Sequence, residues 1–440
     1  MIKNKYAYIR RQIQEVSDGG LSVLYSKLRK GINLLNPLSI LGVLCAIPVV
    51  FVIRAIKFFY FIRFGTMTSA RIGHFAIDAS IMLSERVMTE QLYEDWFWLN
   101  TPTCNGQLER MVRRVFYVRW WVRYLYYANK IIPGGRSHEV VKPAGSLDTK
   151  GFIERAKHIN TSYLPFSAEE DKEAEDFLFR LGWKQGERFV CLMARDSRYL
   201  AEVSSRDSFS YHNYRDSDID TYHAAALELA ERGYWVFRMG KYRWHSFCCK
   251  HPHVIDYAFN DNRSDLLDVW LMANCYFCIS TGTGTDEIAG SYRRPIVYVN
   301  FLPFSLFPTW RYCISTPKHL VWKNTGEPLS LKEHLEHNYV SSYKYAEFGI
   351  NVVDLSSDEI KDAVMEMERQ LIGEGTANVR DTELQQKFWD VFKAWPEFSK
   401  LHGFIHPDTR MGAAYLSNNP GFLRRNCPTP NDQNIIKSAE

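Results

Sequence analysis

Short apolar runs alternate with helical patterns in the second half of the chain. The apolar runs span residues 188–193, 234–238, 253–256, 276–280 and 296–300. Between them, residues 220–231 place Tyr222, Ala225 and Leu229 on one helical face before Gly233, and residues 264–273 form a second helical stretch. Strands that alternate with amphipathic helices predict βαβ units, and therefore an α/β fold with a parallel sheet covered on both faces.

Polar residues and glycines follow the predicted strands. The residues beyond the carboxyl ends are Arg195 and Asp196, then 239–241, Tyr257, 280–286 and Asn300. In a parallel sheet the ligand binds outside these ends. The pattern therefore predicts a functional site at this edge of the sheet.

The segment Ser280-Thr281-Gly282-Thr283-Gly284-Thr285-Asp286 is the most informative of these ends. A strand that turns through Gly-x-Gly into a helix, here from Asp286, leaves backbone N–H groups unpaired at a positive helix end, where they suit a diphosphate. A tight turn that needs glycine for its geometry alone is the alternative. A P-loop kinase is excluded, because no Gly-Lys-Ser/Thr follows the glycines.

A further apolar pattern lies near the N-terminus. Residues 38–53 are apolar apart from Ser39, Gly42 and Pro48, and cations flank them on both sides. The run is short for a membrane span, which takes about twenty residues. We expect residues 32–63 to form a re-entrant or interfacial hairpin kinked at Pro48 on the cytoplasmic face, with a single span or a buried helix pair as alternatives. A cleaved signal peptide is not expected.

Arginines interleave with aromatic residues over 110–130, for example at Arg119, Trp120, Trp121 and Arg123. These residues suit the headgroup layer of an anionic membrane, and an amphipathic helix packed between domains is the alternative. Stacking on single-stranded nucleic acid would use the same residue types. A net charge of +4 is too small to favour nucleic acid, and no other signature supports it.

Size and cysteine content narrow the class of protein. A chain of 440 residues is expected to hold two domains plus additional segments. The nine cysteines are an odd number and are scattered, as is typical of reduced thiols in the cytosol. Cys275 and Cys278 are assigned to the core rather than to a metal site, because no second pair lies nearby.

Several motifs together resemble a family of bacterial GT-B glycosyltransferases that occur with surface-polysaccharide genes. They are residues 214–222, Arg238-Met239-Gly240, Ser264-Asp265, 279–284 and 294–300, with 69–75, 347–350 and 410–413 further out. The resemblance covers most of the chain. It implies two Rossmann-like domains facing a cleft and a nucleotide-sugar donor, with no separate cofactor. The implied domains are 65–165 and 166–375, between a membrane-associated segment at 1–64 and C-terminal helices with a tail at 376–440.

More distantly, Arg71-Ile72-Gly73-His74 resembles the strand-to-helix turn that opens heptosyltransferase-type GT-B enzymes. Those enzymes typically carry an aspartate where this chain has His74. The resemblance implies that the imidazole of His74 is the general base, which suits its proton affinity near neutral pH. Asp78, one helical turn on, is the fallback base and could also orient the imidazole. A capping role for His74 is the alternative.

The transfer chemistry needs positive charge at the leaving phosphate. Arg195 and Arg238 are the predicted cations, with Gly240 beside Arg238, and ion-paired surface arginines are the alternative. Ser264 and Asp265 open a helix, where capping is their ordinary role, and the family resemblance also places them near the nucleotide.

The acidic run Asp216-Ser217-Asp218-Ile219-Asp220 has a spacing that suits oxygen ligands, but we interpret it mainly as a helix cap in a long loop. The sequence as a whole predicts a membrane-associated, metal-independent and inverting glycosyltransferase at the cytoplasmic face of the inner membrane. Its partners would be a nucleotide-sugar and a glycan or lipid-linked acceptor. A non-catalytic glycan-binding or polysaccharide-assembly scaffold with the same fold is the alternative from a different class.

Overall fold

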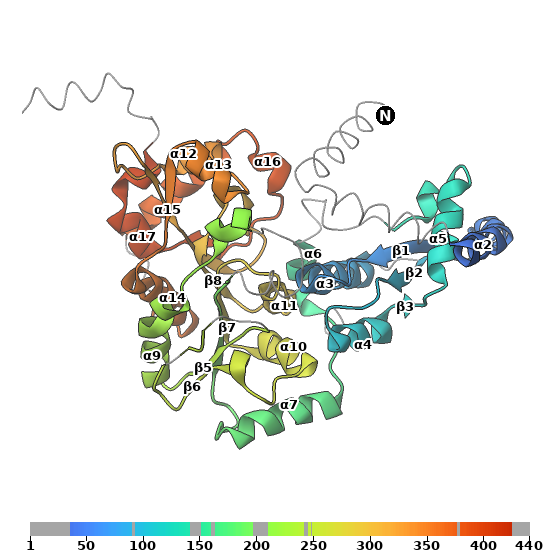
Figure 1. Cartoon of the computed structure of the whole chain (residues 1–440), viewed down its shortest axis with the longest axis horizontal. Coiled ribbons are helices and arrows are strands. Elements are labelled where there is room, and N and C mark those ends of the chain that lie inside the picture. Colours follow the sequence, from blue (N-terminus) through green and yellow to red (C-terminus); the bar gives the residue numbers. More distant parts are fainter. Residues whose placement is uncertain are drawn as a thin grey trace, which may run out of the picture. The chain divides into compact units, whose positions relative to one another are not determined.

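The computed structural model describes residues 36–89, 93–140, 151–159, 163–196, 210–241, 245–247, 249–375 and 379–424. These residues form two compact units, and Figure 1 labels many of their elements. Unit 1 holds the described residues of the ranges 1–67, 91–100 and 116–141, and unit 2 holds the remainder. The predicted boundaries at 65–165 and 166–375, and the predicted cleft between two Rossmann-like domains, stay predictions.

Unit 1 combines a small parallel sheet with two helices. Its strands, in spatial order, are β1 (Phe61–Met67), β2 (Tyr93–Leu99) and β3 (Tyr117–Val118). Helix α2 (Pro37–Ala55) packs against helix α5 (Val122–Ile131), and the short helix η1 (Gly135–His138) follows. The core of the unit contains Val50 from α2, Phe64 from β1 and Leu125 from α5.

The predicted hairpin kinked at Pro48 is wrong for the residues of α2. Residues 37–55 form one continuous helix that contains Pro48, and the side chain of Asn36 caps it by accepting the N–H of Leu38 at 3.1 Å. A proline removes one intrahelical hydrogen bond, and the packing of Val50 and Ile53 on one side holds the rest of the helix together. Among the described residues, α2 alone is long and apolar enough to cross a membrane.

Unit 2 is built on a sheet whose neighbouring strands all run parallel. Within the described residues, its order is β12 (Arg410–Met411), β9 (Cys313–Pro317), β8 (Ile296–Phe301), β7 (Phe277–Ser280), β4 (Phe189–Met193), β5 (Trp235–Arg238) and β6 (Val254–Ile255). The five predicted strands are therefore confirmed, as is the α/β class with parallel sheets. The direction of chain progression reverses between β4 and β7, which is the switch point of the sheet.

Helices cover both faces of this sheet (Figure 1). Helices α9 (His223–Glu231) and α14 (Ser357–Leu371) lie on one face, and α10 (Asp265–Asn274) and α11 (Asp286–Ser291) lie on the other. Every residue of β4, β7 and β8 is buried, because both faces are covered. Helix α9 ends just before Gly233, whose φ of +87° suits a glycine after a helix, as the sequence predicts.

The remaining elements of unit 2 are a second, smaller sheet and further helices. An antiparallel pair consists of β10 (His319–Trp322) and β11 (Ile350–Val353). The other helices are α3 (Ile72–Thr89), α4 (Gly106–Val115), α6 (Gly151–Arg155), α7 (Ala168–Arg180), α12 (Leu331–Glu336), α13 (Ser342–Glu347), α15 (Val379–Lys393), α16 (Phe398–Leu401) and α17 (Ala413–Asn418). The short helices are η3 (Ala156–His158), η4 (Ser210–Arg215), η5 (Ile219–Tyr222), η6 (Tyr257–Phe259), η7 (Phe304–Leu306) and η8 (Pro420–Leu423).

Candidate functional site

The glycine turn follows β7 at the switch point, and part of it is satisfied by the protein itself. The carboxylate of Asp286 accepts the hydroxyl of Ser280 at 2.6 Å and the N–H of Thr283 at 2.8 Å. The N–H of Gly282 donates to the oxygen of Ser280 at 3.1 Å. The predicted unpaired N–H groups are therefore not those of Gly282 and Thr283, because the side chains of Ser280 and Asp286 in the same turn accept these hydrogen bonds.

Two N–H groups further along the turn remain available. Among the described residues, the N–H groups of Gly284 and Thr285 have no hydrogen-bond acceptor. Helix α11, which follows, has only six residues, so its dipole contributes little. Burial raises the pKa of the Asp286 carboxyl to about 7, with a further contribution from Glu287. The turn therefore carries less negative charge near neutral pH than an ordinary aspartate would give it.

Both glycines of the turn also have packing roles. Gly282 has φ of +79°, and a Cβ there would lie 2.7 Å from the ring of Phe301. Gly284 lies against the start of α3, where a Cβ on Gly73 would be 2.8 Å from the Cα and the carbonyl oxygen of Gly284. These contacts support the alternative hypothesis that the turn needs glycine for its geometry. The contact between Gly73 and Gly284 also places the first turn of α3 beside the glycine turn.

The first turn of α3 carries His74. Its side chain is exposed, and among the described residues its imidazole makes no hydrogen bond. Asp78 lies one turn further along α3 and is only 2% exposed. That Asp78 orients the imidazole stays a prediction, and its burial leaves His74 as the more accessible candidate base.

Two arginines converge on the glycine turn. The backbone N–H of Arg195 donates to the hydroxyl oxygen of Thr281 at 3.1 Å, and its Nε donates to Asp216 at the same distance. Arg215 donates through Nη2 to the carbonyl of Gly282. The Nε of Arg215 is buried without an acceptor, and burial together with the charge of Arg195 lowers the pKa of Arg215.

Arg215 and Lys318 are the cations that sequence reasoning missed. Arg215 ends η4, far along the chain from any strand end, so only the folded chain brings it to the turn. Lys318 follows β9, a strand that the apolar pattern did not reveal, and its Nζ donates to the carbonyl of Asp216 and to Asp354. The short run Cys313-Ile314 before a polar segment was the available signal for that strand.

The structure does not bring Arg238 to the glycine turn. Arg238 is 2% exposed, and its Nη1 donates to the carboxylate of Asp256 at 3.0 Å. Its guanidinium also lies 5.5 Å from the ring of Phe259. Arg238 is therefore a buried, ion-paired residue rather than the surface arginine considered as its alternative. Gly240, two residues on, adopts a positive φ of +148°.

Ser264 and Asp265 both act as helix caps. The hydroxyl of Ser264 accepts the N–H of Leu267 at 3.1 Å at the start of α10. The carboxylate of Asp265 accepts the N–H of Gly106 at 2.7 Å, and its carbonyl accepts the side-chain amide of Asn105 at 3.0 Å. Asp265 thus ties the start of α4 to α10, a role that sequence reasoning did not identify.

The acidic run before α9 behaves as a cap, as expected. The carboxylate of Asp218 accepts the N–H of Asp220 at 3.0 Å at the start of η5, and Asp216 pairs with Arg195. Within the part of the chain that the structure describes, no group of three or more His, Cys, Asp or Glu residues is arranged to hold a metal ion.

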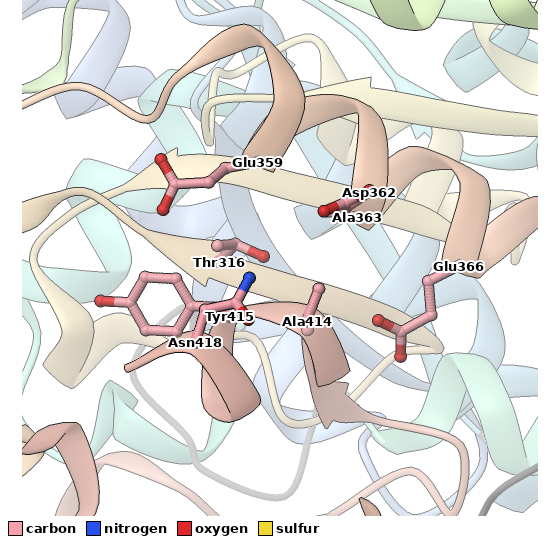
Figure 2. A pocket seen from close by; sticks show the side chains of 9 residues that line it. Thr316, Glu359, Asp362, Ala363, Glu366, Ala414, Tyr415 and Asn418 are labelled. Atoms are coloured by element: carbon pink, nitrogen blue, oxygen red, sulfur yellow. The ribbon is translucent and has the colours of Figure 1, made fainter. Parts of the chain in front are cut away.

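The two cavities found in unit 2 are not lined by residues of the glycine turn. Figure 2 shows a cavity between β9, α14 and α17, bordered by Thr316, Glu359, Asp362 and Glu366. Its volume is about 10 Å³. It has room for one water molecule and is too small for a nucleotide. Burial raises the pKa of Glu366 to about 7. A second cavity of about 510 Å³ is lined by residues of β10, α12 and η8, and no predicted site residue lines it.

No protein-family model and no curated protein matches the chain. Among solved structures, the chain is similar to a family 9 glycosyl transferase from Veillonella parvula DSM 2008, with 11% identity and a TM-score of 0.36 over 59% of this chain and 86% of that one. It is also similar to the E. coli ADP-heptose LPS heptosyltransferase II, with 12% identity and a TM-score of 0.33 over 58% and 90%. A third neighbour is the E. coli heptosyltransferase WaaC with ADP, with 10% identity and a TM-score of 0.28 over 66% and 99%. These neighbours are glycosyltransferases, but at such scores the likenesses carry no argument about the activity of this chain.

Proposed function

We propose that this chain is a glycosyltransferase that moves a sugar from a nucleotide-sugar donor to a glycan or lipid-linked acceptor at the cytoplasmic face of a membrane. The observation that carries the proposal is that Arg195 and Arg215 both contact the glycine turn at the switch point of the sheet, Arg195 through its backbone N–H and Arg215 through its guanidinium. Asp216 pairs with Arg195, and the Nε of Arg215 lacks an acceptor. A diphosphate would supply both the negative charge and the acceptor oxygens.

The proposed reaction uses few groups. The acceptor hydroxyl transfers its proton to the imidazole of His74 as its oxygen attacks the anomeric carbon. The bond between that carbon and the phosphate oxygen breaks, and the leaving diphosphate gains charge. The guanidinium groups of Arg195 and Arg215, with the N–H groups of Gly284 and Thr285, stabilise that charge without needing a metal ion. Attack opposite the leaving group inverts the anomeric centre.

Turnover of a nucleotide-sugar panel by the purified full-length protein tests this proposal. We expect one donor to be cleaved in the presence of EDTA, with release of its nucleoside diphosphate. The variant H74A should lower kcat about a hundredfold while leaving donor affinity unchanged, since an imidazole base acts on the acceptor. Complete loss of activity in EDTA with recovery in magnesium would refute the metal-free step. Unchanged turnover of H74A would remove His74 from the mechanism.

One observation favours the second candidate, a non-catalytic glycan-binding or assembly scaffold. Ser280 and Asp286 occupy N–H groups of the turn that a diphosphate would otherwise use. Calorimetry with nucleoside diphosphates separates the candidates, because a scaffold of this kind should bind none of them, whereas the enzyme must bind at least one.

A further inference from the structure

Helix α2 presents an apolar face to solvent along its whole length. Leu38, Leu44 and Val52 are 73%, 55% and 60% exposed, and Phe58 and Phe59, just beyond the helix, are 86% and 93% exposed. Only 17% of the apolar stretch of α2 is buried inside the protein, whereas the core helix of a soluble protein is mostly buried. A continuous apolar surface of this kind marks an interaction site.

The opposite face of α2 is already bound within unit 1. Ala46, Val50 and Ile53 repeat at helical spacing and are buried in the core shared with α5. The approach of the two helices is close, because a Cβ on Gly42 would lie 2.9 Å from the ring of Tyr124 in α5. One face of α2 therefore packs against α5, and the other face has no protein partner among the described residues.

The end of α2 is tied down by hydrogen bonds. Arg54 donates through Nε to the side chain of Asn129 at 3.0 Å and through Nη1 to the carbonyl of Pro133 at 2.8 Å. Its Nη2 also donates to the carbonyl of Ile132 at 3.1 Å. These bonds hold the C-terminal turn of α2 against the end of α5 and the residues that follow it.

The contacts of α2 decide between crossing a bilayer and lying in its surface. To cross, α2 would have to leave α5 and break the bonds of Arg54, or draw α5 and its neighbouring strand into hydrocarbon. α5 carries Arg123 and Lys130, and irregular backbone and sheet edges are not stable in lipid. Lying parallel to the surface buries the free apolar face without breaking any of these contacts.

Cations and an exposed tryptophan border this apolar face. Lys57 is exposed, with its Nζ 5.1 Å from the ring of Phe58, at one end. At the other end, Trp120 is 68% exposed and packs against Tyr124, the residue that contacts Gly42. The described residues of unit 1 contain seven Lys and Arg against three Asp and Glu. This combination matches the headgroup layer of an anionic bilayer.

We infer that α2 is an in-plane membrane anchor, whose free face inserts together with Phe58 and Phe59 into the surface of an anionic bilayer without crossing it. The inference rests on the proposed function only for the contact with a membrane, and not for the transfer reaction. It replaces the predicted hairpin and the single span with a helix that lies flat.

Flotation of the full-length protein with vesicles tests the surface contact. We expect binding to phosphatidylcholine vesicles that contain phosphatidylglycerol, weaker binding to phosphatidylcholine alone, and release by salt. The double variant F58S/F59S should bind at least about tenfold more weakly, and the control F348S, at a half-exposed phenylalanine of unit 2, should bind normally. Absence of binding, an unaffected double variant, or indifference to lipid charge would overturn the inference. No donor is present, so failure here leaves the transfer reaction untouched.

Spin labels along α2 separate lying flat from spanning. Leu38, Cys45 and Val52 are exposed and seven residues apart, so they share a helical face. Labels at L38C, at the native Cys45 and at V52C, each in a background without other reactive cysteines, should report the same shallow depth in anionic vesicles. A label at Cys45 that lies much deeper than the two end labels would show a span. Labels shielded from both lipid and water probes would show that another part of the chain covers the face. Either result would overturn the inference.

Discussion

Replacing Arg215 by methionine distinguishes a functional guanidinium from a structural one. In the free protein, Arg215 lies near the like charge of Arg195 and has a buried Nε without an acceptor, while Nη2 donates to the carbonyl of Gly282. Removing an unsatisfied buried donor gains about 1–3 kcal/mol, and losing a hydrogen bond from a charged group costs about 1.5–3 kcal/mol. These contributions nearly cancel, so the free energy of unfolding of R215M should lie within about 1 kcal/mol of that of the natural protein.

Arg238 provides the matched control. It is 2% exposed and paired with Asp256, so R238M leaves a carboxylate without its cation. Breaking a buried pair in this way costs about 3–5 kcal/mol. We expect the lower end of that range, because Asp256 is 16% exposed and keeps the N–H of Phe247.

The assay combines urea unfolding with calorimetric titration of the nucleoside diphosphate that the natural protein releases. R215M should keep its stability and bind the nucleotide about 10- to 100-fold more weakly, since one charge-assisted contact to phosphate is lost. R238M should lose stability, and its folded fraction should bind the nucleotide normally. An R215M protein that is as unstable as R238M and that binds nucleotide normally would instead show that Arg215 is a structural residue.

Two further predictions concern the glycine turn. Burial raises the pKa of the Asp286 carboxyl to about 7, so the folded protein binds the carboxyl proton more tightly than the unfolded chain does. The bound proton therefore stabilises the fold at low pH, and this stabilisation is lost as pH rises from about 4 to about 7. D286N keeps an oxygen for Ser280 and Thr283, so the free energy of unfolding should fall less over this range than in the natural protein; an identical pH dependence would exclude Asp286 as the titrating group. G73A adds a Cβ against the backbone of Gly284, and we expect about 1–3 kcal/mol of destabilisation with at least tenfold lower turnover. Natural stability and turnover in G73A would contradict this contact.

The strands and local caps could be predicted because their causes lie close together in the chain. Runs such as 276–279 and 296–299 contain only apolar or aromatic residues, as strands buried on both faces require. Ser264 accepts the N–H of the residue three positions later, and Asp218 accepts the N–H of the residue two positions later. Both capping roles are therefore visible in the local sequence.

The features that escaped prediction depend on distant partners or on competition within the turn. Asp265 binds the N–H of Gly106, which is 159 positions away, and Arg215 reaches Gly282 across 67 positions. Pro48 suggested a reversal, but the packing of α2 on α5 keeps the helix continuous. The hydrogen bond from the N–H of Thr283 to the carboxylate of Asp286 is local, and an acidic residue three positions after a threonine was a signal for it.

The structure of a complex with the nucleoside diphosphate that the protein releases would show whether the glycine turn holds the leaving group. We expect phosphate oxygens to lie within hydrogen-bonding distance of the guanidinium groups of Arg195 and Arg215 and of the N–H of Gly284. Phosphates bound away from the glycine turn, with Arg195 and Arg215 in their present contacts, would contradict this expectation.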